Sequence, residues 1–524
     1  MKRGNLFYIS IILALLVIVI FIIFKNPLGD NISGKAVLSV KGQQQQLTMF
    51  SSAGVSSAQN INKSFSNDSS YLLKITKPIY SLSISADINL NSENSLVRVI
   101  LVDKNQKEYL VYEAYPYITA QGNIKVENIC EETCALEGIV PDSLKIQVAD
   151  ATIKLNSIAF SDSLAKLNKD ARTLGPKSYS RGLKREQDSF KITKLNETIK
   201  SKGMQWTAGE TSVSNMTYEE KRKLFGGEVP NLQGFEYYKS GIFEINPEKN
   251  AESNSLLTGD VVSASDSLPA SFDWRSRSGE NWMTPVKNQG SCGSCWAFAA
   301  IGATEAAINL YYNQHINADL SERDTVCRHS GGCDRGGFPQ EALMELRSTG
   351  LTTESCFGYY TSCSHKCSDY QQKLWKIQGF TAVPSDDISI KKALIKNGPI
   401  TFCIFSWHHC MTLVGYSYSA TTKQTTWILK NSWSDDWGEN GYGRVIVKSQ
   451  DDRDALVSIN KPYFASNPSK YTISCVDKDK DGYCNWGISS TKPSTCPASC
   501  KALEDCDDSN RALHVYDSNY NCVP

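Results

Sequence analysis

Residues 35–162 alternate between hydrophobic and polar positions in short runs. The runs include "SLSISADINL" and "SLVRVILVD", and turns rich in Asn, Asp and Ser separate them. A period of two residues is typical of half-buried β-strands, and no helical period interrupts it. The pattern predicts a small antiparallel β-sandwich over 35–162. We expect this domain to be a stalk, with sugar binding as the alternative.

A longer apolar run stands before these strands. Leu6 to Phe24 contains no charged residue and no proline. As a helix this run would span about 28 Å, close to the thickness of a bilayer's hydrocarbon core. Residues 1–25 are therefore predicted to be a transmembrane signal anchor, with Lys2 and Arg3 in the cytoplasm. The remaining chain would be extracytoplasmic at the cell surface, or secreted if the alternative, a cleaved signal peptide, applies.

After the predicted strands, the pattern of polar and hydrophobic residues changes twice. Residues 163–189 are polar and are predicted to be a linker, whereas a helical pattern returns over 190–227. In "MTYEEKRKLFGG", Thr217 is placed as an N-cap with Glu220 three residues later, and glycine ends the run. These signals predict a short helix. Residues 247–267 show no periodicity and are predicted to be unstructured.

Charge and cysteine content narrow the class of protein. Lysine plus arginine equals aspartate plus glutamate, 55 against 55, so net charge gives no reason to expect a nucleic acid partner. The 17 cysteines fall into clusters that are even once Cys295 is set aside. Even clusters in an exported chain indicate disulfides. Cys130 and Cys134 in "CEETC" fit a local disulfide better than a metal site, because no second pair lies nearby.

The odd cysteine lies in a stretch that can support nucleophilic chemistry. In "GSCGSCWAFAA", Cys292 sits in a glycine-serine loop and Cys295 begins an alanine-rich run with no proline. A helix start there would stabilise a thiolate. The alternative is a structural or redox CxxC pair. His408 and His409 precede the strand-like "CMTLVGY", and Asn431 follows in "LKNSW", which supplies an imidazole and an orienting amide for a cysteine nucleophile.

Four stretches together resemble the signature blocks of papain-like cysteine peptidases, the papain and cathepsin family. They are "LPASFDWR", "PVKNQGSCGSCWAF", "HHCMTLVGY" and "LKNSWSDDWGENGYG", and the resemblance covers residues 268–465. It implies an α+β fold in which a helical half and a β-barrel-like half meet at a cleft. It also implies protein or peptide substrates and no cofactor for catalysis.

The resemblance assigns roles to individual residues. The nucleophile would be Cys295, with its backbone N–H as one oxyanion donor; the family's spacing to Gly415 selects His409 over His408 as the base and acid. The resemblance also implies that Asn431 orients the imidazole and that Gln289 is a second oxyanion donor. It implies substrate binding by Gly336, Gly337 and Trp433. It further implies a disulfide between Cys292 and Cys333. Trp433 would also shield the hydrogen bond between Asn431 and His409 from water.

Some features depart from the family's pattern. Only eight residues separate "GPI" from His409, so part of the cleft wall is expected to be rebuilt, and Cys403 and Cys410 flank this hairpin as a candidate disulfide. "GCDRGG" has one residue more than the family's block, which weakens the assignment of the two glycines. The pairing of Cys327 with "CFGYYTSCSHKC" is left open, and a zinc site there is the weaker alternative to disulfides.

The resemblance extends upstream to residues 190–267. "GMQWTAGETSVSNMTYEEKRKLFGG" is similar to the prosegment of the cathepsin B branch, which blocks the cleft. Residues 190–267 would thus be an inhibitory prosegment followed by a processing stretch, with Trp206 and Phe225 docked on the enzyme. The chain's own prosegment is then its intramolecular partner.

Residues 470–524 form a separate predicted module. "CVDKDKDGYC" places Asp477, Asp479 and Asp481 at alternate positions before a glycine, as in the first half of an EF-hand loop. The segment resembles calcium-binding repeats of thrombospondin type 3 kind. Ca²⁺ and three disulfides would hold it together, and a solvated acidic turn is the alternative.

These predictions combine into one multidomain protein. We expect a membrane-anchored papain-like cysteine endopeptidase made as a zymogen. One alternative is a transpeptidase that uses the same acyl-enzyme. The other is a catalytically silent surface-binding protein, against which the joint presence of the four catalytic residues argues.

Overall fold

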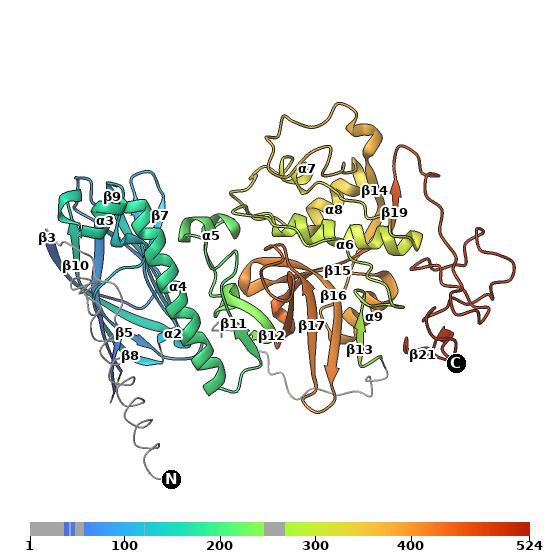
Figure 1. Ribbon diagram of the computed structural model, residues 1–524, viewed down its shortest axis with the longest axis horizontal. Coiled ribbons are helices and arrows are strands. Elements are labelled where there is room, and N and C mark those ends of the chain that lie inside the picture. The colour runs from blue at the N-terminus through green and yellow to red at the C-terminus, as the bar shows by residue number, and fades with distance from the viewer. Residues whose placement is uncertain (1–35, 41–42, 48–56, 120, 168, 246–267) are drawn as a thin grey trace, which may run out of the picture.

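The computed structural model describes residues 36–40, 43–47, 57–119, 121–167, 169–245 and 268–524. Three folded parts follow one another in Figure 1: a two-sheet domain (residues 57–161), a main domain (residues 268–464) and a C-terminal module (residues 470–524). Helices and a bridging segment (residues 206–245) connect the first two parts. The expected signal anchor (1–25) and processing stretch (247–267) lie outside the described residues. Among the residues described, no helix has both the length and the apolar character needed to cross a membrane.

Residue alternation builds the two-sheet domain. Its strands are β3 (Ser57–Phe65), β4 (Ser69–Leu72), β5 (Ser81–Leu90), β6 (Leu96–Asp103), β7 (Glu108–Ala114), β8 (Gly122–Ile129), β9 (Pro141–Ala149) and β10 (Ala151–Ser161). They form two antiparallel sheets of order β3-β10-β5-β8 and β4-β9-β6-β7. Leu82, Ile84 and Ile88 of β5 share one buried core with Val97 and Val99 of β6, so the sheets pack face to face across their apolar sides. Before them, β1 (Ala36–Val40) and β2 (Gln43–Leu47) form a separate two-stranded sheet.

The linker predicted over residues 163–189 is wrong. This stretch contains α3 (Lys169–Leu174) and the first half of α4 (Pro176–Ser201). The buried face of α4 includes Gln187, Asp188 and Lys191 as well as apolar side chains. Hydrophobic periodicity cannot reveal such a helix, because the helix has no continuous apolar stripe. Its polar side chains are buried favourably because they pair with groups on other segments of the chain.

The bridging segment joins the main domain's sheet. It contains β11 (Trp206–Ala208), α5 (Tyr218–Leu224) and β12 (Tyr238–Ile245). The expected capping box begins α5: Thr217 accepts a hydrogen bond from the Glu220 N–H, and the Glu220 carboxylate accepts one from Thr217. Strand β12 pairs in parallel with β18 (Tyr442–Val447), so the segment is built into the main domain.

The main domain has a helical half and a sheet half. The helices are α6 (Cys295–Tyr312), α7 (Glu322–Val326), α8 (Pro339–Ser348) and α9 (Asp387–Asn397). The strands are β13 (Ser271–Asp273), β14 (Trp375–Ala382), β15 (Ile400–Ile404), β16 (His409–Ser419), β17 (Gln424–Lys430), β18 and β19 (Arg453–Phe464). Including the bridging segment, the sheet order is β11-β12-β18-β17-β16-β15-β19-β14, with β13 paired to β16. Gly302 lets α6 approach Thr412 of β16 closely, since a Cβ at Gly302 would lie 2.8 Å from the Thr412 hydroxyl.

The C-terminal module contains little regular structure. Among its described residues the only strands are β20 (Val515–Tyr516) and β21 (Cys522–Val523), which pair with each other. Three disulfides cross-link the module. The side-chain amide of Asn313 attaches it to α6 by donating to the carbonyls of Ser474 and Asn485.

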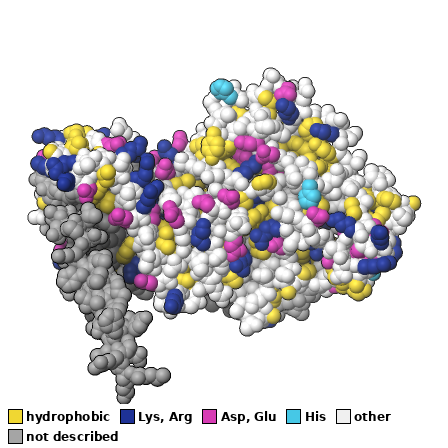
Figure 2. Space-filling view, in the orientation of Figure 1, with side chains coloured by type: hydrophobic (Ala, Val, Ile, Leu, Met, Phe, Trp, Pro, Cys, Tyr) yellow, Lys and Arg dark blue, Asp and Glu magenta, His cyan; other side chains and the backbone are white. Residues whose placement is uncertain are grey.

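Figure 2 shows basic and acidic side chains interspersed over the visible face of the molecule.

Candidate active site

Cys295 is the free thiol of the described chain and the first residue of α6. The other cysteines form eight disulfides. The thiol is buried, with its sulfur 3.9 Å from the His408 carbonyl oxygen. Burial raises the pKa of Cys295 to about 11, opposed by backbone N–H groups of Cys410, Trp296 and Cys295 itself. The N–H groups at the helix start therefore favour a thiolate, but burial keeps the thiol protonated here.

His409 and Asn431 form a fixed pair. His409 begins β16, Asn431 follows β17, and the Nε2 atom of His409 lies 2.8 Å from the Oδ1 atom of Asn431. We assign the proton to Nε2, because an amide oxygen only accepts. The Nδ1 atom is buried with no hydrogen-bond partner among the described residues, which leaves it available as a proton acceptor. Burial lowers the pKa of His409 to about 4, against the opposing effect of the hydrogen bond that His409 donates to Asn431.

Trp433 covers this pair. Its ring stacks on the imidazole of His409, with 4.5 Å between ring centroids and 28° between planes. Trp433 is 1% exposed, so it excludes water from the hydrogen bond between His409 and Asn431. This position is compatible with the predicted shielding, and the backbone carbonyl of Trp433 accepts a hydrogen bond from Ser212 of the bridging segment at 2.5 Å.

The side-chain amide of Gln289 is also fixed. Its Nε2 atom donates to the carbonyl of Cys292 at 2.8 Å and to the carbonyl of Leu224 at 3.3 Å, and its Oε1 atom accepts from Ser432 at 2.6 Å. Leu224 belongs to the bridging segment, so this amide already donates to a peptide carbonyl from another part of the chain. Sequence reasoning missed Ser432, although it stands next to Asn431 in the quoted motif.

The two predicted substrate-binding glycines lie in different surroundings. Gly336 meets the bridging segment: a Cβ on Gly226 would lie 2.4 Å from the Gly336 nitrogen, and a Cβ on Gly293 would lie 2.7 Å from the Gly226 Cα. Gly337 instead packs against Trp296, where a Cβ would lie 2.7 Å from the indole ring. Of the two glycines, Gly336 is therefore the one whose backbone lies against the bridging segment.

The disulfides stabilise the loops around the site. Cys292 is bonded to Cys333, which ties the loop before Cys295 to the loop that carries Gly336. Cys403 and Cys410 are bonded across β15 and β16, next to His409. The remaining bonds of this domain join Cys327 to Cys363 and Cys356 to Cys367. A zinc site there is excluded in this state, because no thiolate among these four cysteines is free.

The aspartates of the C-terminal module converge from two stretches of chain. One carboxylate oxygen each of Asp477, Asp479 and Asp508 lies within 4.8 Å of the others, and the same holds for Asp479, Asp481 and Asp505. One oxygen of Asp479 and one of Asp505 are buried with no hydrogen-bond partner among the described residues. Burial raises the pKa of Asp505 to about 7. Clustered carboxylate oxygens suit a hard divalent cation such as Ca²⁺, although the His514 ring already pairs with Asp481.

Comparison with known proteins identifies relatives of the main domain. Residues 268–411 and 405–461 match the family model described as papain family cysteine protease. The senescence-specific cysteine protease SAG12 of Arabidopsis thaliana is 36% identical over 222 residues, which cover 37% of this chain and 61% of that protein. The probable cysteine protease RD21C of the same plant is 27% identical over 372 residues, covering 66% of this chain and 74% of that protein.

The matches are partial. The chain spans 41% of the length of cysteine protease 1 of Oryza sativa and 60% to 61% of the senescence-specific proteases. Among solved structures, the recombinant stem bromelain precursor is 24% identical, with 54% of this chain and 93% of that chain covered at a TM-score of 0.39.

Proposed function

Residues 268–461 belong to the papain family of cysteine proteases, and from that premise we propose that this protein is a cysteine endopeptidase synthesised as a latent precursor. One observation carries the proposal. His409 donates from Nε2 to Asn431, and its Nδ1 atom has no hydrogen-bond partner among the described residues. The backbone on both sides of His409, at residues 408 and 410, contacts the free thiol of Cys295. A nucleophile, a base and an orienting amide are thereby combined.

Acylation would proceed as follows. The thiol proton of Cys295 passes to Nδ1 of His409, and the thiolate attacks the carbonyl carbon of the scissile peptide bond. The oxygen gains negative charge and accepts hydrogen bonds from the Gln289 amide and the Cys295 backbone N–H. When the C–N bond breaks, His409 returns the proton to the leaving amine, and a thioester to Cys295 remains.

Deacylation would use the same groups in reverse. His409 removes a proton from water, the hydroxide attacks the thioester carbonyl, and the C–S bond breaks with release of the acid and the Cys295 thiol. The family implies no metal for this cycle. Protein and peptide substrates are proposed because Gln289 donates to a peptide carbonyl, that of Leu224, in the structure described.

The bridging segment is proposed to be an inhibitory prosegment of cathepsin B type. Three contacts support this. Gln289 donates to the Leu224 carbonyl, Phe225 packs against His409 and Trp433, and Gly226 lies between Gly293 and Gly336. Trp206, by contrast, packs within the segment itself against Phe243, with ring centroids 4.8 Å apart. Cleavage within residues 247–267 is the proposed activating step.

An extracytoplasmic location and a calcium-binding module complete the proposal. The eight disulfides support an oxidising compartment, and residues 1–25 would provide the membrane anchor. The five converging aspartates of the C-terminal module are proposed to hold Ca²⁺, which would stabilise the module and take no part in the peptidase reaction. One buried oxygen each of Asp479 and Asp505, without a hydrogen-bond partner among the described residues, supports this assignment.

Active-site labelling tests the peptidase assignment. A recognition sequence for a site-specific protease is placed within residues 247–267, the protein is cut, and hydrolysis of a fluorogenic peptide is measured with and without an epoxysuccinyl thiol-peptidase inhibitor. We expect turnover, its loss with inhibitor, and an adduct mapped to Cys295. Cys295→Ala should show neither turnover nor adduct; unchanged turnover in that variant would exclude Cys295 as the nucleophile.

A further inference from the structure

We propose that the two-sheet domain is an inhibitory clamp, which together with α4 holds the bridging segment in the cleft, so that residues 57–245 act as one inhibitor. The inference rests on the proposed function, because a clamp matters only if the segment blocks an active site. It assigns a role to a domain for which the sequence suggested only a stalk or a sugar-binding unit.

The bridging segment needs support on both of its sides. The part that reaches the catalytic residues contains one helix, α5, of seven residues. Isolated helices shorter than about 12 residues are marginal in water. One side of this part packs on the main domain, at His409, Gln289 and Gly336. The position of Leu224 and Phe225 therefore depends on what covers the other side.

The two-sheet domain contacts the start of α5 on that other side. The carboxylate of Glu132 accepts a hydrogen bond from the Tyr218 backbone N–H at 2.6 Å, at the positive end of the helix. The Tyr218 hydroxyl donates to the side-chain oxygen of Gln147 at 3.2 Å. The Glu219 carboxylate accepts from the Glu108 backbone N–H at 3.3 Å. These contacts fix the first turn of the helix whose last residues enter the site.

A buried arginine of the two-sheet domain binds the chain just after the site. Arg98 lies within the apolar strand β6, is 4% exposed and forms an ion pair with Glu113. Its Nη1 and Nη2 atoms donate to the carbonyls of Val229 and Pro230 at 2.5 and 3.1 Å. A buried guanidinium is costly unless its donors are satisfied, and the bridging segment supplies two of its acceptors.

Further contacts continue along the same stretch of chain. Asn231 and Gln233 donate to the backbone and side-chain oxygens of Asn94 at 3.1 Å each, and Lys145 pairs with Glu228 at 2.6 Å. Leu96, Ile100 and Leu110 of the two-sheet domain share a buried core with Leu224, Phe225, Val229 and Leu232. Polar and apolar contacts thus flank the residues that fill the cleft.

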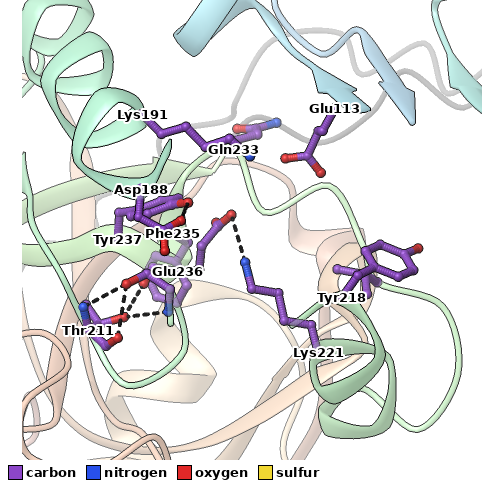
Figure 3. Close-up of polar contacts among 12 residues, drawn as sticks. Glu113, Asp188, Lys191, Thr211, Tyr218, Lys221, Gln233, Phe235, Glu236 and Tyr237 are labelled. Atoms are coloured by element: carbon purple, nitrogen blue, oxygen red, sulfur yellow. Dashed lines mark hydrogen bonds and ion pairs between the residues drawn. The ribbon is translucent and has the colours of Figure 1, made fainter. Parts of the chain in front are cut away.

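Helix α4 closes the clamp. Lys191 pairs with Glu131 of the two-sheet domain at 2.6 Å, while Asp188 accepts from the Tyr237 hydroxyl at 3.1 Å and Lys184 donates to the Ser214 carbonyl at 2.8 Å. Figure 3 shows Lys191 and Asp188 of α4 above Tyr237, with Lys221 of α5 directed at Glu236. In Figure 1, α4 lies between the strands of the two-sheet domain and the bridging segment. The helix therefore ties the clamp to the chain on both sides of α5.

The test compares two charge-removing double variants in the full chain. Each protein is cut within residues 247–267 by a site-specific protease, and the apparent inhibition constant is obtained from peptide hydrolysis during serial dilution. R98M/E113Q should raise that constant by at least about tenfold, since hydrogen bonds from a charged donor are lost. K125M/E127Q is the control: it removes a surface ion pair of β8, and should change the constant by less than about twofold. Equal constants for the two variants would overturn the clamp.

A double-mutant cycle covers the possibility that R98M/E113Q fails to fold. Gln147→Ala and Tyr218→Phe remove the two sides of one interfacial contact without leaving a buried charge. If the clamp acts through this contact, their effects on the inhibition constant will be less than additive. If neither single variant changes the inhibition constant and the double variant shows only the sum of the two effects, the result would count against the clamp.

A failed clamp and a failed peptidase are separable. Gel filtration of the cut protein follows separation of residues 268–524 from the preceding part without any need for turnover. If the cut wild type hydrolyses no peptide, the proposed function fails, while earlier separation of the halves in R98M/E113Q would still support the clamp. If the cut wild type is active, but the halves of R98M/E113Q separate at the same dilution as those of the control K125M/E127Q, only the clamp is rejected.

Discussion

Phe225 lies edge-on to the imidazole of His409, with 6.0 Å between ring centroids and 75° between planes. Trp433 stacks on the same imidazole, so two aromatic rings from different parts of the chain contact it. His409 is fully buried as a result. The raised pKa of Cys295 and the lowered pKa of His409 leave both groups uncharged in this closed site.

The first prediction separates the adjacent histidines. His409→Asn should lower the kcat of the cut enzyme by about 10²- to 10⁴-fold, because the general base is lost. His408→Asn is the matched control: His408 has a left-handed backbone with φ 48°, a conformation that asparagine tolerates. It should retain most activity in the peptide hydrolysis assay. The reverse result would mean that the wrong histidine was assigned.

The second prediction concerns Asn431. Its Oδ1 atom also accepts from the Ser432 backbone N–H at 2.8 Å, so the amide is held in place while it orients the imidazole. Asn431→Ala should lower kcat by at least about tenfold with little change in KM, because Asn431 contacts His409 and not the substrate. Steady-state kinetics of the cut variant measure both constants. A higher KM at unchanged kcat would contradict this positioning role.

The third prediction concerns latency and uses neighbouring glycines. Gly226 has φ 65°, and a Cβ there would lie 2.4 Å from the Gly336 nitrogen. Gly226→Ala should therefore expel the loop and raise peptide hydrolysis by the uncut protein by about tenfold or more. Gly227→Ala is the control, since a Cβ there meets nothing within 4 Å. Equal latency in the two variants would argue against a blocked cleft.

Sequence motifs predicted the chemistry of the site because the residues concerned lie in short, contiguous stretches. Cys295 begins a helix whose alanine-rich sequence is visible, and His409 and Asn431 stand at the ends of strands that alternate or run apolar. The positions of these residues relative to the bridging segment were not predictable in the same way. The hydrogen bond from Gln289 to Leu224 joins two loops far apart in sequence, and no local pattern encodes it.

The clamp illustrates a second limit of sequence reasoning. Arg98 looks like a solvent-facing polar residue in an otherwise apolar strand, and only the fold shows that it is buried against Val229 and Pro230. Likewise, the polar residues of 163–189 suggested a linker, although Asp188 of α4 is buried by its partners. Buried polar networks have the same composition as solvated surface, so composition cannot distinguish the two.

The fourth prediction concerns calcium in the C-terminal module. Chelation should speed limited proteolysis within residues 470–524 and leave peptide hydrolysis by the cut enzyme largely unchanged, because the aspartates are separate from the catalytic groups. Asp505→Asn should reproduce this sensitivity in the presence of Ca²⁺. Asp507→Asn, outside both convergent groups, is the control. If chelation leaves the proteolysis rate unchanged, the aspartates form a solvated turn and no calcium site.

The last prediction is the direction of the pH effect on latency. Burial lowers the pKa of His409 to about 4 from an ordinary 6.5. The closed site thus binds fewer protons at His409 than an open site does, so protons favour opening. Above about pH 6.5, the titration of His409 does not affect the equilibrium between the closed and open states. As pH falls from 6.5 towards 4, the equilibrium constant for opening rises by up to about tenfold per pH unit. In a Cys295→Ala background, which prevents self-digestion, the cut halves should separate at a lower dilution at about pH 5 than at about pH 7.5. Adding His409→Asn should reduce this difference, and an equal pH dependence in both proteins would show that other groups control opening.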